Sequence, residues 1–524
     1  MKNIKYLSIL LSLSLLIGCN EPEDVLEDFN ALPEETVDLP ALTAGSADFS
    51  TYVSLGNSLT AGFSDGTVFR AAQENSYPSI MAQQFALVGG GTFTQPLVND
   101  NFGGLAAGGN RIAGPRLITT GGAPQPLESV IGPVTVTTDI VLNKPTGPFN
   151  NMGVSGANSF HLLDLGIPGS GYGDINGLGV YANPYFIRMA SAPDATIIGD
   201  AMAQNPTFFS LWIGANDVLG YATSGGDGSI TITDQTTFDL AYGALISSLT
   251  SGGAKGVIAN VPNVESAPFF NTVPNNALVI DAATAGQLTG FFQAVAGIFT
   301  QVLIAQMVPP ANAQQLASQY AITFEEGANR FLIDVPVTAT NPLGFRQMTE
   351  EEKLLLPIDQ GALAQGYGSV ALTPEVLQVL GILQAGGTPT PEQGALVIGA
   401  VNGIDDGDAL DSDELQAIRT ATNGYNATIS AAATANGLAF VDSFSITTQI
   451  ATSGYSSNGF TITGGLVTGG GFGLDGIHGT SRGYALFANE FLKAIDVAYG
   501  SNFEASGNLV NLGDYPTNYS PLLQ

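Results

Sequence analysis

Short apolar runs that alternate with helical patterns are the sequence feature that most constrains how this chain can fold. Four such runs, each of four to six residues, lie at 52–55, 208–213, 256–261 and 438–441. Uninterrupted apolar runs of this length are typical of parallel strands that are buried on both faces of a sheet. We therefore predict that the four runs form strands of one central sheet.

Helical patterns separate these runs. Apolar residues at helical spacing over 238–249 predict a helix that ends before the glycine pair at 252–253. Two more helices are predicted at about 412–436 and 480–499. Strands that alternate with helices favour a parallel sheet with helices on both faces, so the predicted fold class is α/β.

Two regions interrupt the alternation. Residues 86–147 are rich in Gly, Thr, Val and Pro, which predicts loops or a small β insertion. Residues 268–410 carry further helices, including one at 288–308. We expect that helix to pack on the domain, and the alternative is a lid or acyl-binding helix over an active site. One domain is thus predicted at 49–500, followed by a C-terminal tail at 501–524. The apolar face of the 288–308 helix comprises Phe291, Phe292, Val295, Ile298, Phe299, Val302 and Leu303.

The N-terminus, residues 1–18, has the features of a secretory signal. Lys2 and Lys5 precede an apolar stretch that runs to Ile17, and Gly18-Cys19 follows. LIGC resembles the lipobox of bacterial lipoproteins, in which the cysteine is diacylated and becomes the new N-terminus. Cys19 is the only cysteine, so no internal disulfide can form. The alternative is an ordinary secretory signal with an unrelated cysteine.

The segment after Cys19, residues 19–48, is predicted to be a flexible tether. Between 20 and 48 it holds nine acids, three prolines and no Lys or Arg. Glu21, Glu23 and Asp24 resemble the export tags of surface lipoproteins in some Gram-negative bacteria. We predict attachment to the outer membrane through the lipid anchor, with surface exposure as a further hypothesis and an outer-membrane protein as a candidate partner.

Charge excludes one class of function. The chain of 524 residues has 14 basic and 45 acidic residues and a formal charge of −31, which argues against nucleic acid as a partner. No stretch of 18 uninterrupted apolar residues follows the signal, so no second membrane span is expected.

The histidines limit which serine can act as a nucleophile, because a serine needs a base nearby to attack an acyl carbon. The chain has two, His161 and His478. His161 lies among apolar residues in SFHLLDL, which predicts a structural role. His478 follows Asp475 by three residues in a Gly-rich loop that enters a helix. An aspartate at that spacing can orient the imidazole and stabilise its charged form, so we predict that Asp475 and His478 act together.

One serine motif has to be excluded. Residues 479–483 match G-x-S-x-G, the nucleophile elbow of α/β hydrolases, which follows a strand and precedes its histidine in the chain. No strand-like run precedes Ser481, and no histidine follows it. We therefore reject Ser481 as the nucleophile.

Four short blocks occur in a fixed order, each at the end of a predicted strand or in a loop. They are GNSLTAG at 56–62, NNMGVSGAN at 150–158, LWIGANDV at 211–218 and LDGIHGTSRGY at 474–484. Together they resemble the sequence blocks of the SGNH, or GDSL-type, serine hydrolases. The blocks frame the chain from 50 to about 498, with 86–147 and 268–410 as insertions.

This resemblance implies a fold and a site. The implied fold has three α/β/α layers around a mainly parallel, flavodoxin-like sheet. The implied site has Ser58 as nucleophile, Asp475 and His478 as its catalytic partners, and Gly156 and Asn216 in the oxyanion hole. No cofactor is implied.

Two positions depart from the family pattern. Asn57 stands where the family usually has an aspartate before the serine, and its side chain can still accept a backbone hydrogen bond in a turn. Gly479 stands where a proline often follows the histidine, which loosens the entry to the last helix. Neither departure removes a catalytic group.

An Asp-rich run at 402–414 raises the question of calcium. Aligned on Gly407, the run places Ile404 where an EF-hand loop needs an oxygen ligand, and Asp413 where it needs a glutamate. We predict a solvated loop that leads into a helix, and no metal.

The predicted function is a serine esterase or lipase that cleaves a lipid ester or an acylated glycan. Two alternatives stay open at this stage. One is an acyltransferase that passes the acyl group to a lipid or glycan hydroxyl, and the other is a lipid-binding outer-membrane lipoprotein with vestigial catalysis. The catalytic residues alone do not distinguish these substrates.

Overall fold

A computed structural model describes residues 38–163, 183–192 and 194–524. The predicted signal at 1–18, Cys19 and the part of the predicted tether up to residue 37 lie outside these ranges. All elements described below belong to one compact unit, Leu42–Glu504 with Asn508–Gln524.

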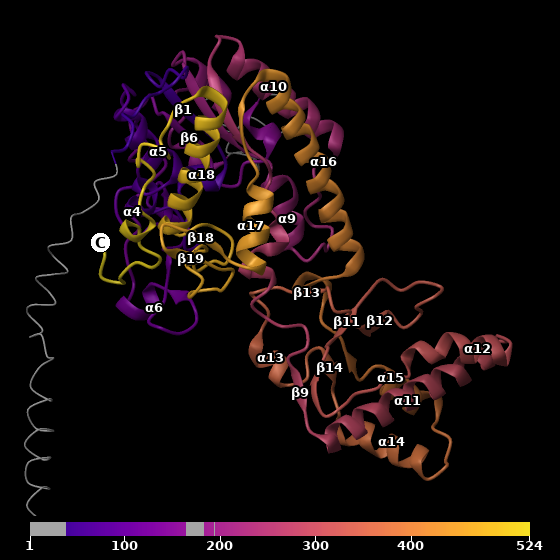
Figure 1. The fold of residues 1–524 in the computed structure, drawn as a ribbon. Coiled ribbons are helices and arrows are strands. Elements are labelled where there is room, and N and C mark those ends of the chain that lie inside the picture. The colour runs from indigo at the N-terminus through magenta and orange to yellow at the C-terminus, as the bar shows by residue number, and fades with distance from the viewer. Residues whose placement is uncertain (1–37, 164–182, 193) are drawn as a thin grey trace, which may run out of the picture. The chain divides into compact units, whose positions relative to one another are not determined.

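The centre of this unit is a sheet of five parallel strands (Figure 1). In space the order is β17-β8-β7-β1-β6. Numbered along the chain from one to five, the strands therefore lie in the order 2-1-3-4-5, a doubly wound order in which ligands bind at the carboxyl ends of the first and third strands. The strands are β1 (Tyr52–Gly56), β6 (Asn151–Gly153), β7 (Phe208–Trp212), β8 (Lys255–Ala259) and β17 (Ala439–Val441).

All four strands predicted from apolar runs are confirmed as β1, β7, β8 and β17. The edge strand β6 was not predicted. Its three residues, Asn-Met-Gly, carry no apolar run, and it is held by its pairing with β1.

Helices cover both faces of the sheet, which gives three α/β/α layers. On one face, Val53 and Leu55 pack with buried side chains of α8 (Ile197–Met202), α10 (Gln235–Thr250) and α16 (Ser412–Asn436). On the other face, Tyr52 packs with α5 (Tyr77–Ala86), α17 (Ser443–Thr452) and α18 (Ser481–Tyr499). Alternate residues of β1 thus point to opposite layers, as a strand requires. The helices predicted at 238–249, 412–436 and 480–499 are confirmed as α10, α16 and α18.

The Asp-rich run at 402–414 leads into a helix, as predicted, but it is not simply a solvated loop. It includes a 3-10 turn at Asp406–Asp408 and the strand β16 (Ala409–Leu410), and Ile404, Ala409 and Leu410 are buried. The Asp411 side chain accepts hydrogen bonds from the backbone N–H groups of Asp413 and Glu414 at the start of α16, and the Glu414 side chain accepts one from the Asp411 N–H. This reciprocal capping box satisfies N–H groups that the first helical turn leaves without partners. Gly437 ends the helix with a φ of +62°, in the left-handed conformation that favours glycine.

Region 86–147, for which the composition leaves loops or a small β insertion open, contains two short strand pairs among loops. It pairs β2 (Leu105–Ala107) with β3 (Asn110–Ala113) and β4 (Leu117–Ile118) with β5 (Gln125–Pro126), and α6 (Glu128–Ile131) follows.

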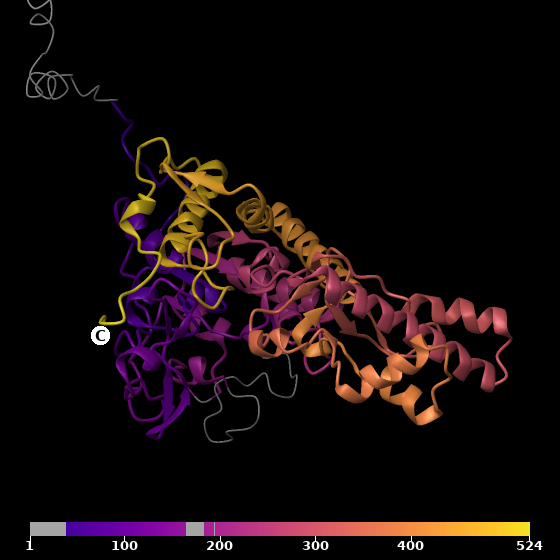
Figure 2. The same cartoon turned by 90° about the horizontal axis from the view of Figure 1, so that it is seen from below.

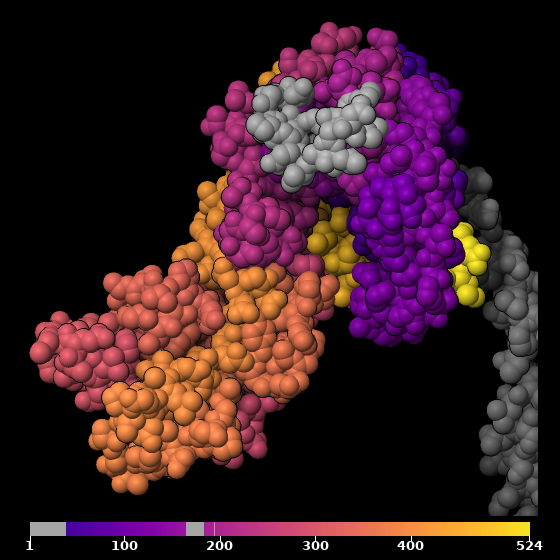
Figure 3. All heavy atoms as spheres, turned by 180° about the vertical axis from the view of Figure 1, so that it is seen from behind, coloured from indigo at the N-terminus to yellow at the C-terminus, as the bar shows by residue number. Residues whose placement is uncertain are grey.

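Region 268–410 forms a separate lobe with a core of its own (Figures 2 and 3). The long helix α11 (Ala282–Ala305) packs there with α12 (Pro310–Ala317), α14 (Pro374–Gln384) and α15 (Pro391–Ile398). The remaining helices of this region are the short α13 (Gln360–Ala364) and short 3-10 segments. Its strands are two-stranded pairs: β9 (Leu278–Ile280) with β10 (Gly327–Asn329), β11 (Leu332–Asp334) with β12 (Phe345–Gln347), β13 (Lys353–Leu354) with β16 (Ala409–Leu410), and β14 (Ser369–Val370) with β15 (Val401–Asn402).

The structure favours the packed helix over the lid for residues 288–308. Phe291, Phe292 and Val295 are buried in the core of the lobe, and no residue of α11 lines the cavity at Ser58. The expectation that Val302 belongs to the buried face of this helix is wrong, because its side chain is 39% exposed. By length and composition α11 is the one helix of the described residues that could cross a membrane, and a helix packed in the core of a lobe meets the same criterion.

Candidate active site

Ser58 is placed by the turn that follows β1. It is the first residue of the short helix α3 (Ser58–Ala61), and it is buried. The Asn57 side chain caps this helix by accepting a hydrogen bond from the Leu59 N–H at 3.0 Å. The asparagine that departs from the family pattern thus makes the turn contact expected of it.

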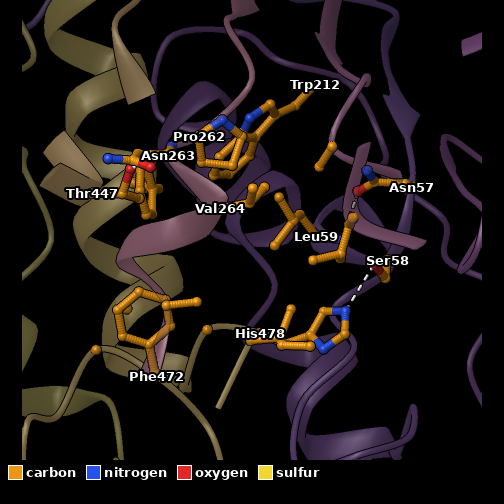
Figure 4. A pocket seen from close by; sticks show the side chains of 18 of the residues that line it. Asn57, Ser58, Leu59, Trp212, Pro262, Asn263, Val264, Thr447, Phe472 and His478 are labelled. Atoms are coloured by element: carbon orange, nitrogen blue, oxygen red, sulfur yellow. Dashed lines mark hydrogen bonds between the residues drawn. The ribbon is translucent and has the colours of Figure 1, made fainter. Parts of the chain in front are cut away.

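Ser58, His478 and Asp475 form a continuous chain of hydrogen bonds. Ser58 Oγ lies 2.8 Å from His478 Nε2 (Figure 4), and His478 Nδ1 lies 2.9 Å from Asp475 Oδ2. Asp475 and His478 come from the loop between β19 (Phe460–Ile462) and α18, 420 residues after Ser58 in the case of the histidine. A hydroxyl, an imidazole and a carboxylate are thereby in direct contact, an arrangement in which an imidazole can take the proton of a serine.

The surroundings of Asp475 keep its carboxyl ionised. Burial alone would raise the pKa of Asp475, but the His478 ring and the N–H groups of His478 and Ile477 hold this pKa well below its usual value. Asp475 Oδ1 accepts hydrogen bonds from both N–H groups at 2.9 Å. A carboxylate held in this way stabilises an imidazolium at His478 when the ring takes a proton.

Asn216 follows β7 as the first residue of α9 (Asn216–Thr223), and its side chain lines the same cavity as Ser58 and His478. Its Nδ2 donates one hydrogen bond to the Ala157 carbonyl at 2.9 Å. The amide nitrogen carries two hydrogens, so this contact fixes the side chain and leaves a second N–H for a ligand.

Gly156 lies in the loop after β6, next to β1 in the sheet, with a φ of +83° that favours glycine. It is not one of the residues that line the cavity. The structure thus brings Ser58, Asn216, Asp475 and His478 together by hydrogen bonds and a shared cavity, and places Gly156 at the neighbouring strand end.

Asp217 links the loop after β6 to α9, and the sequence did not single it out for this role. Its carboxylate accepts hydrogen bonds from the Ser159 N–H and Oγ, both at 2.8 Å. Burial raises the pKa of Asp217 to about 6, against the effect of these hydrogen bonds. The hydrogen bonds between Asp217 and Ser159 fix Asn216, which precedes Asp217 in the chain, relative to the loop that holds Gly156.

Asp65 and Gly66 form hydrogen bonds with the loop that carries Asp475 and His478, and sequence reasoning missed them. Asp65 Oδ1 accepts a hydrogen bond from the Leu474 N–H at 2.8 Å, and the Gly66 N–H donates to Asp475 Oδ2 at 2.9 Å. Both residues have positive φ, +51° at Asp65 and +84° at Gly66, which aims both groups at the loop. Burial and the charge of Asp475 raise the pKa of Asp65 to about 7, against the Leu474 N–H and the charge of Arg116.

Replacing Asp65 with asparagine is expected to stabilise the protein increasingly as pH rises. The folded-state pKa of about 7 lies above the ordinary value of 3.8, so the folded state binds more protons than the unfolded state between these values and loses stability as pH increases. The asparagine side chain would keep an oxygen for the Leu474 N–H and carry no charge. The advantage of Asp65→Asn in free energy of unfolding should grow by about 2 to 3 kcal/mol from pH 5 to pH 8. Denaturant unfolding of both proteins at the two pH values measures this difference in stability. A difference that does not change with pH would contradict the raised pKa of Asp65.

The cavity beside Ser58 is lined mostly by apolar side chains (Figure 4). They come from the carboxyl ends of β1, β7 and β8, from α9 and the residue before it, from α17, from the loop before α18 and from α18 itself. The apolar lining residues are Leu59, Trp212, Ala215, Leu219, Pro262, Val264, Ala267, Ile450, Phe472, Ile477, Tyr484 and Phe487.

The two residues rejected as catalytic groups are engaged elsewhere. His161 Nδ1 accepts a hydrogen bond from the Asn158 N–H, and burial lowers the pKa of His161 to about 4, so its ring is neutral at pH 7. Ser481 is buried at the start of α18, where its Oγ pairs with the Tyr519 hydroxyl. Both interpretations from the sequence agree with these contacts.

Within the described residues, no group of three or more His, Cys, Asp or Glu side chains is arranged to hold a metal ion. No protein-family model, curated protein or solved structure matches the chain. A function for this site therefore has to be argued from its own geometry.

Proposed function

We propose that this protein is a serine esterase of the SGNH hydrolase type, which cleaves carboxylic esters through an acyl-enzyme on Ser58. The observation that carries the proposal is the hydrogen-bonded chain from Ser58 Oγ through His478 to Asp475, with distances of 2.8 and 2.9 Å. A buried serine hydroxyl in contact with an imidazole that a carboxylate orients is the arrangement in which the imidazole can take the hydroxyl proton. These distances also argue against vestigial catalysis.

The fold supports the same proposal. In a doubly wound sheet the ligand site lies outside the carboxyl ends of the strands, where the strand order reverses. Ser58 follows β1 and Asn216 follows β7, which are the two strands at that point. The strand order 2-1-3-4-5 is the flavodoxin-like order that the family resemblance implies.

In the acylation step, Ser58 Oγ attacks the ester carbonyl carbon while His478 Nε2 takes the hydroxyl proton. The Asp475 carboxylate stabilises the resulting imidazolium through Nδ1. The carbonyl oxygen becomes an oxyanion, held by the N–H groups of Ser58 and Gly156 and by the second Nδ2 hydrogen of Asn216. The C–O bond then breaks, and His478 gives its proton to the leaving alcohol.

In the deacylation step, water takes the place of the alcohol. His478 Nε2 removes a proton from the water as its oxygen attacks the acyl carbon. The same donors hold the second oxyanion. The bond to Ser58 Oγ breaks, His478 returns the proton to the serine, and the carboxylic acid leaves.

Covalent labelling tests the proposal directly. A fluorophosphonate reacts with activated serines, and it should add one phosphonyl group per chain, on the tryptic peptide that carries Ser58. Parallel hydrolysis of nitrophenyl esters should be lost in proportion to labelling. A protein that cleaves no ester and takes up no label, or takes it up on Ser481, would contradict the proposal.

Replacing Asn216 with alanine is expected to lower kcat by about 10² to 10³ while KM changes much less, because the donor acts on the oxyanion rather than on the ground state. Initial rates over a range of ester concentrations give both constants. Asn436→Ala, at the exposed end of α16, is the matched control and should leave both unchanged. Near-normal turnover of Asn216→Ala would remove Asn216 from the mechanism.

We further propose that the enzyme is a lipoprotein of a Gram-negative outer membrane, attached through Cys19. This proposal rests on the lipobox-like LIGC and the acidic tether. Mass spectrometry of the N-terminal peptide tests it, since lipidation requires a mature chain that begins at an acylated Cys19.

A further inference from the structure

The cavity beside Ser58 extends away from the catalytic residues into the protein. Figure 4 shows Leu59 and Val264 between Ser58 on one side and Asn263 and Thr447 on the other. Three side chains that line its inner part are less than a tenth exposed, with values of 2% for Trp212, 7% for Val264 and 5% for Thr447. The reacting serine thus lies at one end of a buried apolar space.

The polar groups of Thr447 and Trp212 in this inner part already have partners within the protein. Thr447 Oγ1 donates to the Ser443 carbonyl at 2.8 Å and accepts from the Asn263 N–H at 2.9 Å. Trp212 Nε1 donates to the Asn260 carbonyl at 3.1 Å. A sugar ring placed against Thr447 and Trp212 would find their polar groups already paired, so its hydroxyl groups there would lose hydrogen bonds to water at a cost that a hydrocarbon chain does not incur.

The size of the cavity sets the length of chain that it can hold. Its volume is about 70 Å³. A space of that size holds roughly five water molecules, and a methylene group takes up about as much room as a water. About five methylene groups beyond the carbonyl therefore fill it, whereas an acetyl group leaves most of it empty.

Of the two halves of an ester, the acyl group fits this space better. The acyl group stays bonded to Ser58 until water attacks, while the alcohol must leave before water can enter. The buried end of the cavity therefore fits the acyl group, because that group stays bonded to Ser58 and does not have to leave before water enters. We propose, on the basis of the esterase function above, that this cavity is an acyl pocket and that the preferred substrates are esters of saturated acids of about six carbons.

Kinetics with two ester series test the pocket. For nitrophenyl esters of increasing acyl length, kcat/KM should rise by about fourfold per methylene up to about six carbons and then level off or fall. For acetate esters of alcohols of increasing length, kcat/KM should change little. Steady values across the acyl series, or a rise only in the alcohol series, would overturn the acyl pocket while leaving the esterase function intact. No Ser58-dependent hydrolysis of any ester would reject the esterase function, and the acyl-pocket proposal with it.

A substitution of a residue that lines the cavity tests whether the dependence of kcat/KM on acyl length arises there. Val264→Phe should reduce the ratio of hexanoyl to acetyl kcat/KM by at least about tenfold, because the larger ring takes the space of several methylene groups. Val497→Phe, at a position 90% exposed on α18, is the matched control and should leave the ratio unchanged. Fluorophosphonate titration counts the folded active sites in each preparation. An unchanged ratio in Val264→Phe would overturn the pocket.

Trp212 offers a readout that does not depend on turnover. It is the only tryptophan in the chain, and it lines the cavity. In Ser58→Ala, methyl hexanoate should shift its fluorescence with saturation, and methyl acetate at the same concentrations should not. Equal responses to both esters would overturn the proposal.

Discussion

Replacing Ser58 with alanine is expected to lower kcat for ester hydrolysis by about 10⁵ to 10⁶, to the level that binding and the oxyanion donors alone provide. The physical reason is that, within the described residues, no second hydroxyl contacts His478 Nε2. Ser58 Oγ is the serine oxygen that His478 Nε2 contacts, at 2.8 Å. Hydrolysis of a nitrophenyl ester under saturating conditions measures the effect.

The matched control for Ser58 is Ser481, the serine of the competing G-x-S-x-G sequence. Its Oγ pairs with Tyr519, so Ser481→Ala should keep kcat within about threefold of the parent, with at most a modest loss of stability. If Ser481→Ala were inactive and Ser58→Ala active, the acyl-enzyme mechanism on Ser58 would be refuted.

The two histidines provide a second comparison. His478→Ala should lower kcat by about 10⁵ to 10⁶, much as loss of the nucleophile does, because serine and histidine act as one unit. Combining it with Ser58→Ala should add little further loss, since each single change already disables that unit. Rate measurements on both single variants and the double variant test this non-additivity.

His161 is the control for that comparison, because it is the only other histidine. His161→Gln keeps an acceptor for the Asn158 N–H and should change kcat by no more than about threefold. A loss in His161→Gln as large as in His478→Ala would mean that the base has been wrongly assigned.

The sequence predicted those parts of the fold that have a local signal. Buried strands such as β7 and β8 are continuous apolar runs, and α16 has capping residues at both of its ends. A short stretch of sequence is therefore enough to place each of these elements. The strand β6 has no such signal. Its three residues become a strand because β1 offers an unpaired edge, which is a property of the assembled sheet.

The same distinction holds for the site. Ser58 and the Asp475–His478 pair lie in short motifs, and the order of these motifs along the chain is enough to group them as one site. Asp65 contacts the Leu474 N–H across 409 residues, and nothing near it in sequence indicates a partner. The base of the 268–410 lobe also touches this loop, through the Phe269 N–H and the Gly476 carbonyl at 3.0 Å, which no local pattern could predict.

Ser58 and His478 are 420 residues apart, and the long lobe between β8 and β17 separates them in the chain. On the proposed function, a chain that ends before residue 478 contains Ser58 but not its base. Asp475 and His478 lie after β17 and directly before α18, so their hydrogen bonds to one another and to Ser58 need this last part of the chain. A serine without its base is not activated, so a shortened chain of the proposed enzyme is expected to leave esters intact.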